Sequence, residues 1–164
     1  MSYKVTRGNA AEPSRASNSG KSGFQTFEDL EVYRVAREFR KAMYAMTRRL
    51  PAFEKYDLGS QIRRGAVSLT NNIAEGHGRY HYPDQSRFFL HSRGSLEELV
   101  DDVNVCLDEN YISADDAKGL KEQALRVLTL LNGYLRYLRS QSSSVRETDE
   151  AERELAGALE GSSL

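Results

Sequence analysis

Apolar side chains recur at alternating steps of three and four residues in four stretches of this chain, and this spacing constrains the fold most strongly. Such steps place residues on one side of an α-helix, whereas a half-buried strand alternates every second residue. No stretch alternates in that way over the length of a strand. The four sets are Val32, Ala36, Phe39, Met43, Met46 and Leu50; Leu58, Ile62, Ala66, Leu69 and Ile73; Phe89, Ser92, Leu96, Leu99, Val103 and Cys106; and Leu120, Ala124, Val127, Leu131, Tyr134 and Leu138. We therefore expect an all-α protein with four amphipathic helices.

Residues typical of helix ends lie between the four sets. Thr26 with Asp29, and Ser113 with Asp116, have the spacing of capping boxes, and Pro51 ends the first pattern. The expected helices cover about 27–50, 54–77, 83 to beyond 106, and 113 to about 138. Because their connections are short, neighbouring helices must run antiparallel. The prediction is an up-down-up-down four-helix bundle over residues 24–139.

The two ends of the chain differ from its middle. Residues 1–23 are rich in small and polar residues with a net charge of +3, and residues 140–164 carry −4. Such segments bury too little apolar surface to offset their ordering entropy, so we expect disorder, with a frayed helix near 146–159 as the alternative at the C-terminal end. The single cysteine excludes an internal disulfide, and no apolar run has the length of a signal peptide or a membrane span. A cytoplasmic protein that does not bind membranes is expected.

Polar residues form second stripes beside the apolar ones in the middle two helices. The expected polar seam between these helices consists of Ser68, Asn72, Glu75, Ser95 and Glu98. We expect Ser68 to face Ser95, and Asn72 and Glu75 to meet Arg87 or His91, because a paired polar seam fixes helix register. Gly65 and Gly94 are expected to let helix backbones approach closely. A ligand-binding or catalytic role for Glu75 and Glu98, or a surface that contacts a partner, remains an alternative.

Known catalytic patterns are missing from the sequence. None of the three histidines follows a glutamate at the Glu-x-x-His spacing of di-iron bundles. Arg87 and His91 are too close together for the motif of HEPN-type helical ribonucleases. The chain also contains no phosphate-binding Gly-x-x-x-x-Gly-Lys loop and no Gly-x-Ser-x-Gly nucleophile turn. We expect no enzymatic activity, no metal and no cofactor.

Charge is unevenly distributed along the middle of the chain. Residues 34–93 hold twelve basic and five acidic side chains, whereas residues 94–116 hold eight acidic and no basic ones. A basic side and an acidic side on one subunit suit head-to-tail contacts, which close into rings. An ordinary solvated surface is the alternative.

Basic and aromatic residues alternate around the second connection, His77-Gly78-Arg79-Tyr80-His81-Tyr82. This composition is typical of surfaces that stack unpaired bases and neutralise phosphates. The alternative is that the tyrosines cover one end of the bundle. The candidate nucleic-acid-binding residues are Arg63, Arg64, Arg79, Tyr80, His81 and Arg87.

Several motifs together resemble one protein family. They are Phe27-Glu28-Asp29-Leu30 with Val32, Leu58-Gly59-Ser60-Gln61-Ile62-Arg63-Arg64, Ser68 with Asn72-Ile73-Ala74-Glu75-Gly76, and Gly94-Ser95-Leu96 with Glu98. Their order and spacing resemble the bacterial 23S rRNA intervening-sequence proteins, also called four helix bundle proteins. The resemblance covers about residues 26–139.

The resemblance implies a four-helix bundle that assembles into a ring-shaped homopentamer without established enzymatic activity. Some members are encoded within insertions in bacterial large-subunit rRNA genes. The family is also similar to the accessory variability proteins of diversity-generating retroelements, which bind nucleic acid and a reverse transcriptase. We expect a ring-forming bundle that binds RNA, DNA or a ribonucleoprotein partner. The alternative is a protein-only scaffold or adaptor, such as an accessory subunit of a reverse transcriptase.

Overall fold

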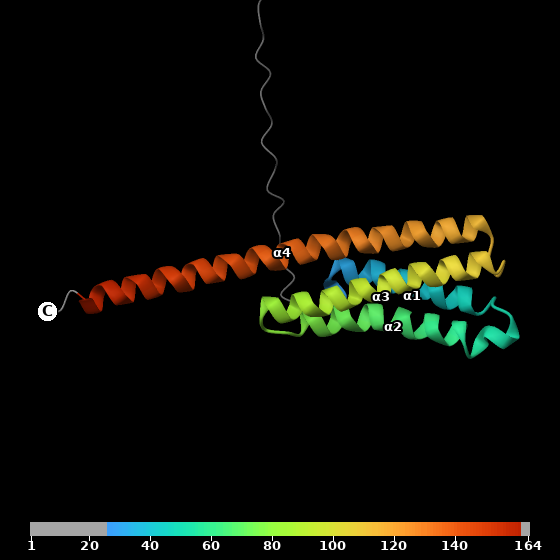
Figure 1. Ribbon diagram of the computed structural model, residues 1–164, viewed down its shortest axis with the longest axis horizontal. Coiled ribbons are helices and arrows are strands. Elements are labelled where there is room, and N and C mark those ends of the chain that lie inside the picture. The colour runs from blue at the N-terminus through green and yellow to red at the C-terminus, as the bar shows by residue number, and fades with distance from the viewer. Residues whose placement is uncertain (1–25, 162–164) are drawn as a thin grey trace, which may run out of the picture.

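Four antiparallel helices form the protein, as the computed structural model in Figure 1 shows. The structure describes residues 26–161, and within that range it contains no strand. The elements are the short 3₁₀ helices η1 (Phe27–Asp29) and η2 (Ala52–Lys55), and the helices α1 (Glu31–Thr47), α2 (Leu58–His77), α3 (Tyr82–Asp108) and α4 (Ala114–Gly161). Helix α1 packs on α2 and α4, and α3 packs on the same two helices. The prediction of an all-α up-down-up-down bundle is confirmed.

The core consists of the apolar stripes that the sequence indicates. Nearly all members of the four predicted sets are buried, including Ser92 and Cys106. In the last set, Leu135 is buried in the core, whereas Tyr134 is only partly buried. Tyr134 stacks on the ring of Phe89, with 4.3 Å between the ring centroids. Partial burial suits tyrosine, because its hydroxyl group must remain near polar partners or solvent.

The first two helices begin later than expected. The capping box of Thr26 and Asp29 is present, but it caps η1, and α1 begins only at Glu31. The segment before α2 forms η2, and α2 begins at Leu58, whose backbone N–H donates to the side chain of Glu54. Both differences arise because a short 3₁₀ turn precedes each helix, and sequence periodicity alone does not distinguish such a turn from an α-helix.

Helix α4 is much longer than expected. It continues without a break to Gly161, so its 48 residues span about 72 Å and extend beyond the bundle (Figure 1). The serine run does not end the helix, and the hydroxyls of Ser140, Ser143 and Ser144 donate to backbone carbonyls one turn earlier, as serines inside a helix can. The domain boundary expected at residue 139 therefore falls inside a helix, and the segment 1–23 lies outside the described residues.

Two glycines explain how closely α2 and α3 pack. A Cβ atom at Gly76 would lie 2.9 Å from the Phe89 ring, and one at Gly65 would lie 3.2 Å from the Leu99 side chain. Gly94 differs from the expectation, because a Cβ atom there would meet nothing within 4 Å. Gly94 lines an open hollow between α2 and α3, so close helix contact does not require a glycine at that position.

Candidate nucleic-acid interface

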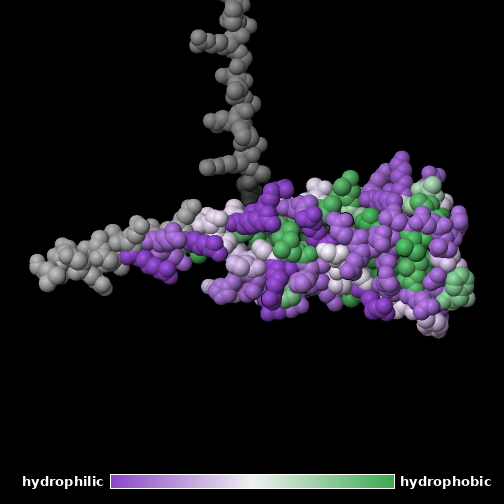
Figure 2. All heavy atoms as spheres, in the orientation of Figure 1, coloured by the Kyte–Doolittle hydropathy of each residue, from purple (hydrophilic) through white to green (hydrophobic). Residues whose placement is uncertain are grey.

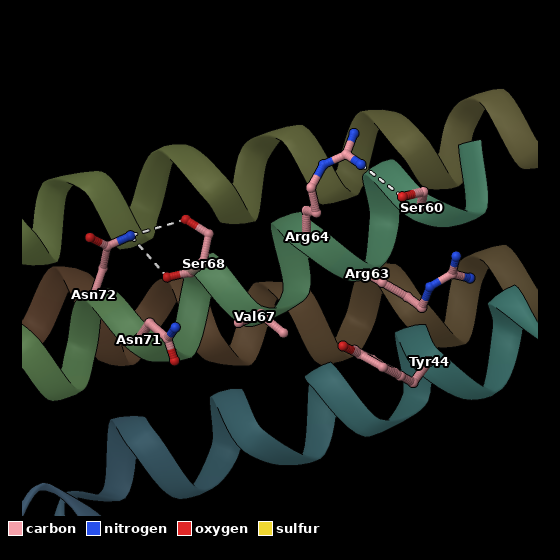
Figure 3. A pocket seen from close by; sticks show the side chains of 8 residues that line it. All are labelled: Tyr44, Ser60, Arg63, Arg64, Val67, Ser68, Asn71 and Asn72. Carbon is pink, nitrogen blue, oxygen red and sulfur yellow. Dashed lines mark hydrogen bonds between the residues drawn. The ribbon is translucent and has the colours of Figure 1, made fainter. Parts of the chain in front are cut away.

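Hydrogen bonds between polar side chains join α2 to α3 at mid-length. The hydroxyls of Ser68 and Ser95 lie 2.9 Å apart, as the expected polar seam requires. The Asn72 amide donates to both the carbonyl and the hydroxyl oxygen of Ser68, at 2.9 and 3.1 Å (Figure 3). Ser68 therefore connects its own helix to the neighbouring one.

A second link lies seven residues away on each helix. The Gln61 amide donates to the Asp102 carboxylate over 2.8 Å, and Asp102 is only 4% exposed. Burial raises the pKa of the Asp102 carboxyl, because a charged group is less well solvated there. Sequence reasoning missed Asp102, although Gln61 precedes Ser68 by one heptad and Asp102 follows Ser95 by one. In antiparallel helices this shared spacing would have predicted that Asp102 faces Gln61.

The predicted pairing of Glu75 with Arg87 or His91 is wrong. Glu75 pairs instead with Arg79, which lies one helical turn later at the end of α2. The nearer partner prevails because it is reached without crossing to α3. The guanidinium of Arg87 lies 5.5 Å from the ring centroid of Phe88. Glu98 is exposed and lines a hollow between α2 and α3.

A basic hollow with a volume of about 570 Å³ runs along α2 from Ser60 to Asn72, with Tyr44 of α1 beside it (Figure 3). Arg63 and Arg64 belong to its wall, and Tyr44 reaches toward it from α1. None of the lining side chains is acidic. The lining residues are Tyr44, Ser60, Arg63, Arg64, Val67, Ser68, Asn71 and Asn72. We refer to these residues as the basic groove.

Neutral oxygens hold the two arginines of the basic groove. Arg64 donates to the hydroxyl of Ser60, and Arg63 donates to the backbone carbonyl of Lys55, each over 2.7 Å. A guanidinium has five N–H donors, so these bonds position the side chains without neutralising their charge. Phosphate groups are suitable ligands for such arginines, especially beside hydroxyl and amide donors. Sequence reasoning missed Tyr44, Ser60 and Asn71, because the groove forms only when α1 packs against α2.

The other predicted basic residues lie at the opposite end of α2. Arg79 and Arg87 hold their guanidinium groups 4.6 and 5.5 Å from the Phe88 ring centroid. Tyr80 is 89% exposed and meets the ring of His81 edge to face. Sixteen residues separate Arg63 from Arg79, which corresponds to about 24 Å along the helix. The structure therefore divides the predicted nucleic-acid-binding residues into two separate groups.

Other kinds of site have little support among the described residues. Within residues 26–161, no three histidine, cysteine, aspartate or glutamate side chains cluster as metal ligands would. Burial raises the pKa of the Cys106 thiol to about 11, which leaves it protonated and unreactive near neutral pH. Over the same range, no helix has both the length and the apolar character that crossing a membrane requires.

Comparison with known proteins identifies the family. The sequence model of the family described as 23S rRNA-intervening sequence protein matches residues 28–133, and no curated protein matches the chain. The matched range begins in η1, includes α1, α2 and α3 entirely, and ends inside α4. It therefore contains all of the core except Leu135 and Leu138, together with the links between α2 and α3 and both groups of basic residues. Because the match spans more than half of the 164 residues, the chain belongs to the 23S rRNA-intervening sequence protein family.

Proposed function

We propose that this protein is a non-catalytic, ring-forming bundle that binds RNA or DNA through the phosphate backbone. The observation that carries the proposal is the basic groove, in which Arg63 and Arg64 stand beside hydroxyl and amide groups without an acidic neighbour in the lining. Phosphates supply most of the affinity in nucleic-acid complexes, and side chains of these types make most of the phosphate contacts.

Ring formation is supported by the distribution of charge. Six of the twelve basic residues of 34–93 lie on α1 and α2, whereas seven of the eight acidic residues of 94–116 lie on α3 and the start of α4. Opposite charges on different sides of one subunit favour head-to-tail contacts between copies, and such contacts close into rings. A homopentamer is the expected assembly. Light scattering at low salt measures it, and a monomer there would contradict the ring.

A binding titration over a salt series tests the proposal. Single-stranded and duplex forms of RNA and DNA are compared by fluorescence anisotropy with the full chain. If both groove arginines neutralise phosphates, the log–log salt slope of the Arg63→Ala/Arg64→Ala variant is shallower by about 1.4 on single strands and 1.8 on duplex DNA. The matched control is Arg34→Ala/Lys41→Ala, which removes two exposed cations of α1 that are already paired with acidic side chains.

The outcome also distinguishes the protein-only adaptor. An intact ring that binds neither RNA nor DNA at low salt would overturn the groove proposal and favour a scaffold that contacts proteins alone. Equal losses of nucleic-acid affinity in the groove variant and the control would show that binding depends only on the net charge of the protein and not on the basic groove.

A further inference from the structure

A second hollow lies where α4 passes the connection between α2 and α3. Its volume is about 480 Å³, and its walls come from segments that are more than 50 residues apart in the sequence. Tyr80, His81, Tyr82 and Pro83 form one wall, and Ser142, Val145 and Arg146 of α4 form the other. We call this the end pocket. It exists because α4 continues beyond the bundle instead of ending near residue 139 (Figure 1).

The walls of the end pocket combine an aromatic surface with one cation. Tyr80 and His81 meet edge to face, with ring centroids 5.1 Å apart, so the mostly exposed face of Tyr80 remains available for stacking. Arg146 stands on the opposite wall and is exposed. No acidic side chain belongs to the lining, so the charge of Arg146 is not opposed within the pocket.

Size and chemistry together indicate the class of ligand. Small-molecule sites usually enclose about 300–1,000 Å³, and the end pocket falls in the lower half of that range. An aromatic face beside an arginine is suited to an unpaired base and its phosphate. An apolar peptide would find few aliphatic contacts, since Val145 and Pro83 are the aliphatic members of the lining.

We propose that the end pocket binds one unpaired nucleotide, with its base on Tyr80 and His81 and its phosphate on Arg146. The inference rests on the proposed function, because a strand held in the basic groove would deliver such a nucleotide. A free nucleotide has the same chemistry and is the other source. The α4 wall lies outside the residues 28–133 that match the family model.

Photo-crosslinking locates the nucleotide. A single-stranded RNA that carries 4-thiouridine is irradiated with the full protein, and the modified peptides are identified by mass spectrometry. Crosslinks on Tyr80 or His81 are expected, and they should decrease in Arg146→Ala. Crosslinks confined to the basic groove, with none at the end pocket, would overturn the inference and leave the proposed function standing.

Affinity measurements separate stacking from charge. Tyr80→Ala should weaken single-strand binding about fivefold or more, whereas Tyr80→Phe should preserve it. Arg146→Ala should reduce the salt slope by about 0.7, and Arg146→Lys should restore it. The matched control is Arg139→Ala, an exposed arginine of α4 outside the end pocket. An unchanged slope in Arg146→Ala would contradict the phosphate contact even if affinity fell through a structural change.

A titration with adenosine monophosphate, followed by nuclear magnetic resonance of the tyrosine rings, distinguishes the two sources. Shifts of Tyr80 that require Arg146 would support the pocket even if the protein bound no strand, and the proposed function alone would then fail. If neither the mononucleotide nor a strand reaches Tyr80, the inference is wrong.

Discussion

Two sides of helix α2 carry polar residues, and they differ in how those residues are paired. Toward α3, Gln61 and Ser68 bond to side chains of the neighbouring helix, and their partners Asp102 and Ser95 are buried. In the basic groove, Arg63 and Arg64 bond only to neutral oxygens and keep their charge. Burial and mutual pairing make the first set structural, whereas exposure and unopposed charge make the second set available to a ligand.

The largest effect on nucleic-acid binding should come from removing the two arginines of the basic groove. We expect Arg63→Ala/Arg64→Ala to weaken nucleic-acid binding by roughly a hundredfold, because two charged hydrogen-bonding contacts are lost. The free energy of unfolding should change by less than about 0.5 kcal/mol, because both side chains lie at the surface. Anisotropy and urea unfolding measure the two quantities. A large loss of stability with unchanged binding would show that the groove arginines are structural and do not bind the ligand.

Removing a member of the paired set should have the opposite signature. Ser95→Ala eliminates the hydrogen bond to Ser68 and should lower the free energy of unfolding by about 1 kcal/mol. Nucleic-acid affinity should stay the same, since Ser68 keeps its bonds to Asn72 in the wall of the groove. Urea unfolding and anisotropy again give the result, with Ser143→Ala as a control at an exposed serine of α4 whose hydroxyl bonds only within its own helix.

Asp102 provides a pH-dependent test of the paired set. Its folded-state pKa is raised, so its contribution to stability is full below the unfolded value of 3.8 and is lost as pH rises through the folded pKa. Asp102→Asn keeps an acceptor for Gln61 and removes the buried charge. The variant should therefore melt at a higher temperature than the parent at neutral pH, and the difference should disappear in acid.

Thermal unfolding between pH 3 and pH 7 measures that difference. Asp101→Asn is the control, because Asp101 is adjacent and exposed. If Asp102→Asn were less stable than the parent at neutral pH, the carboxylate would be needed in its charged form, and the paired set would not be purely structural.

The smallest effect on nucleic-acid affinity is expected from the ion pair at the end of α2, in which a candidate phosphate-binding arginine is paired with an acidic side chain. Glu75→Gln frees Arg79 from its ion pair and should raise nucleic-acid affinity by less than about threefold. Stability should change by at most about 0.5 kcal/mol, as for other exposed helical ion pairs. Glu97→Gln, which removes a similarly spaced partner from Arg93 on α3, is the matched control. A decrease in affinity would mean that the Arg79 pair itself takes part in binding.

The bundle could be predicted because its helices follow simple spacing rules. The sets that contain Phe39, Leu69 and Leu99 are buried as their spacing indicates. On the face that Figure 2 shows, most side chains are hydrophilic and the hydrophobic ones lie in small separate groups. Family membership also followed from the sequence, because Asn-Ile-Ala-Glu-Gly and Gly-Ser-Leu-x-Glu are specific in order and spacing.

The candidate site was less predictable, because it depends on which helices meet. Tyr44 joins the basic groove only through the packing of α1 on α2, and Arg146 reaches the end pocket only because α4 remains helical. Composition suggested disorder after residue 139, with a frayed helix near 146–159 as the alternative, whereas α4 continues through both segments to Gly161. Glu75 was assigned a distant partner, although Arg79 lies one turn away.

The length of α4 makes the two ends of the bundle different. Its last 15 residues, beyond Arg146, form an arm of about 22 Å that leaves the bundle at one end only. In a cyclic assembly whose axis runs along the bundle, every arm would emerge on the same side, so the two openings of the ring would be chemically unlike. One opening would be fringed by arms and end pockets, and the other would present the exposed rings of Phe53 and Tyr56. A nucleic-acid strand that entered such a ring would contact different residues at each opening.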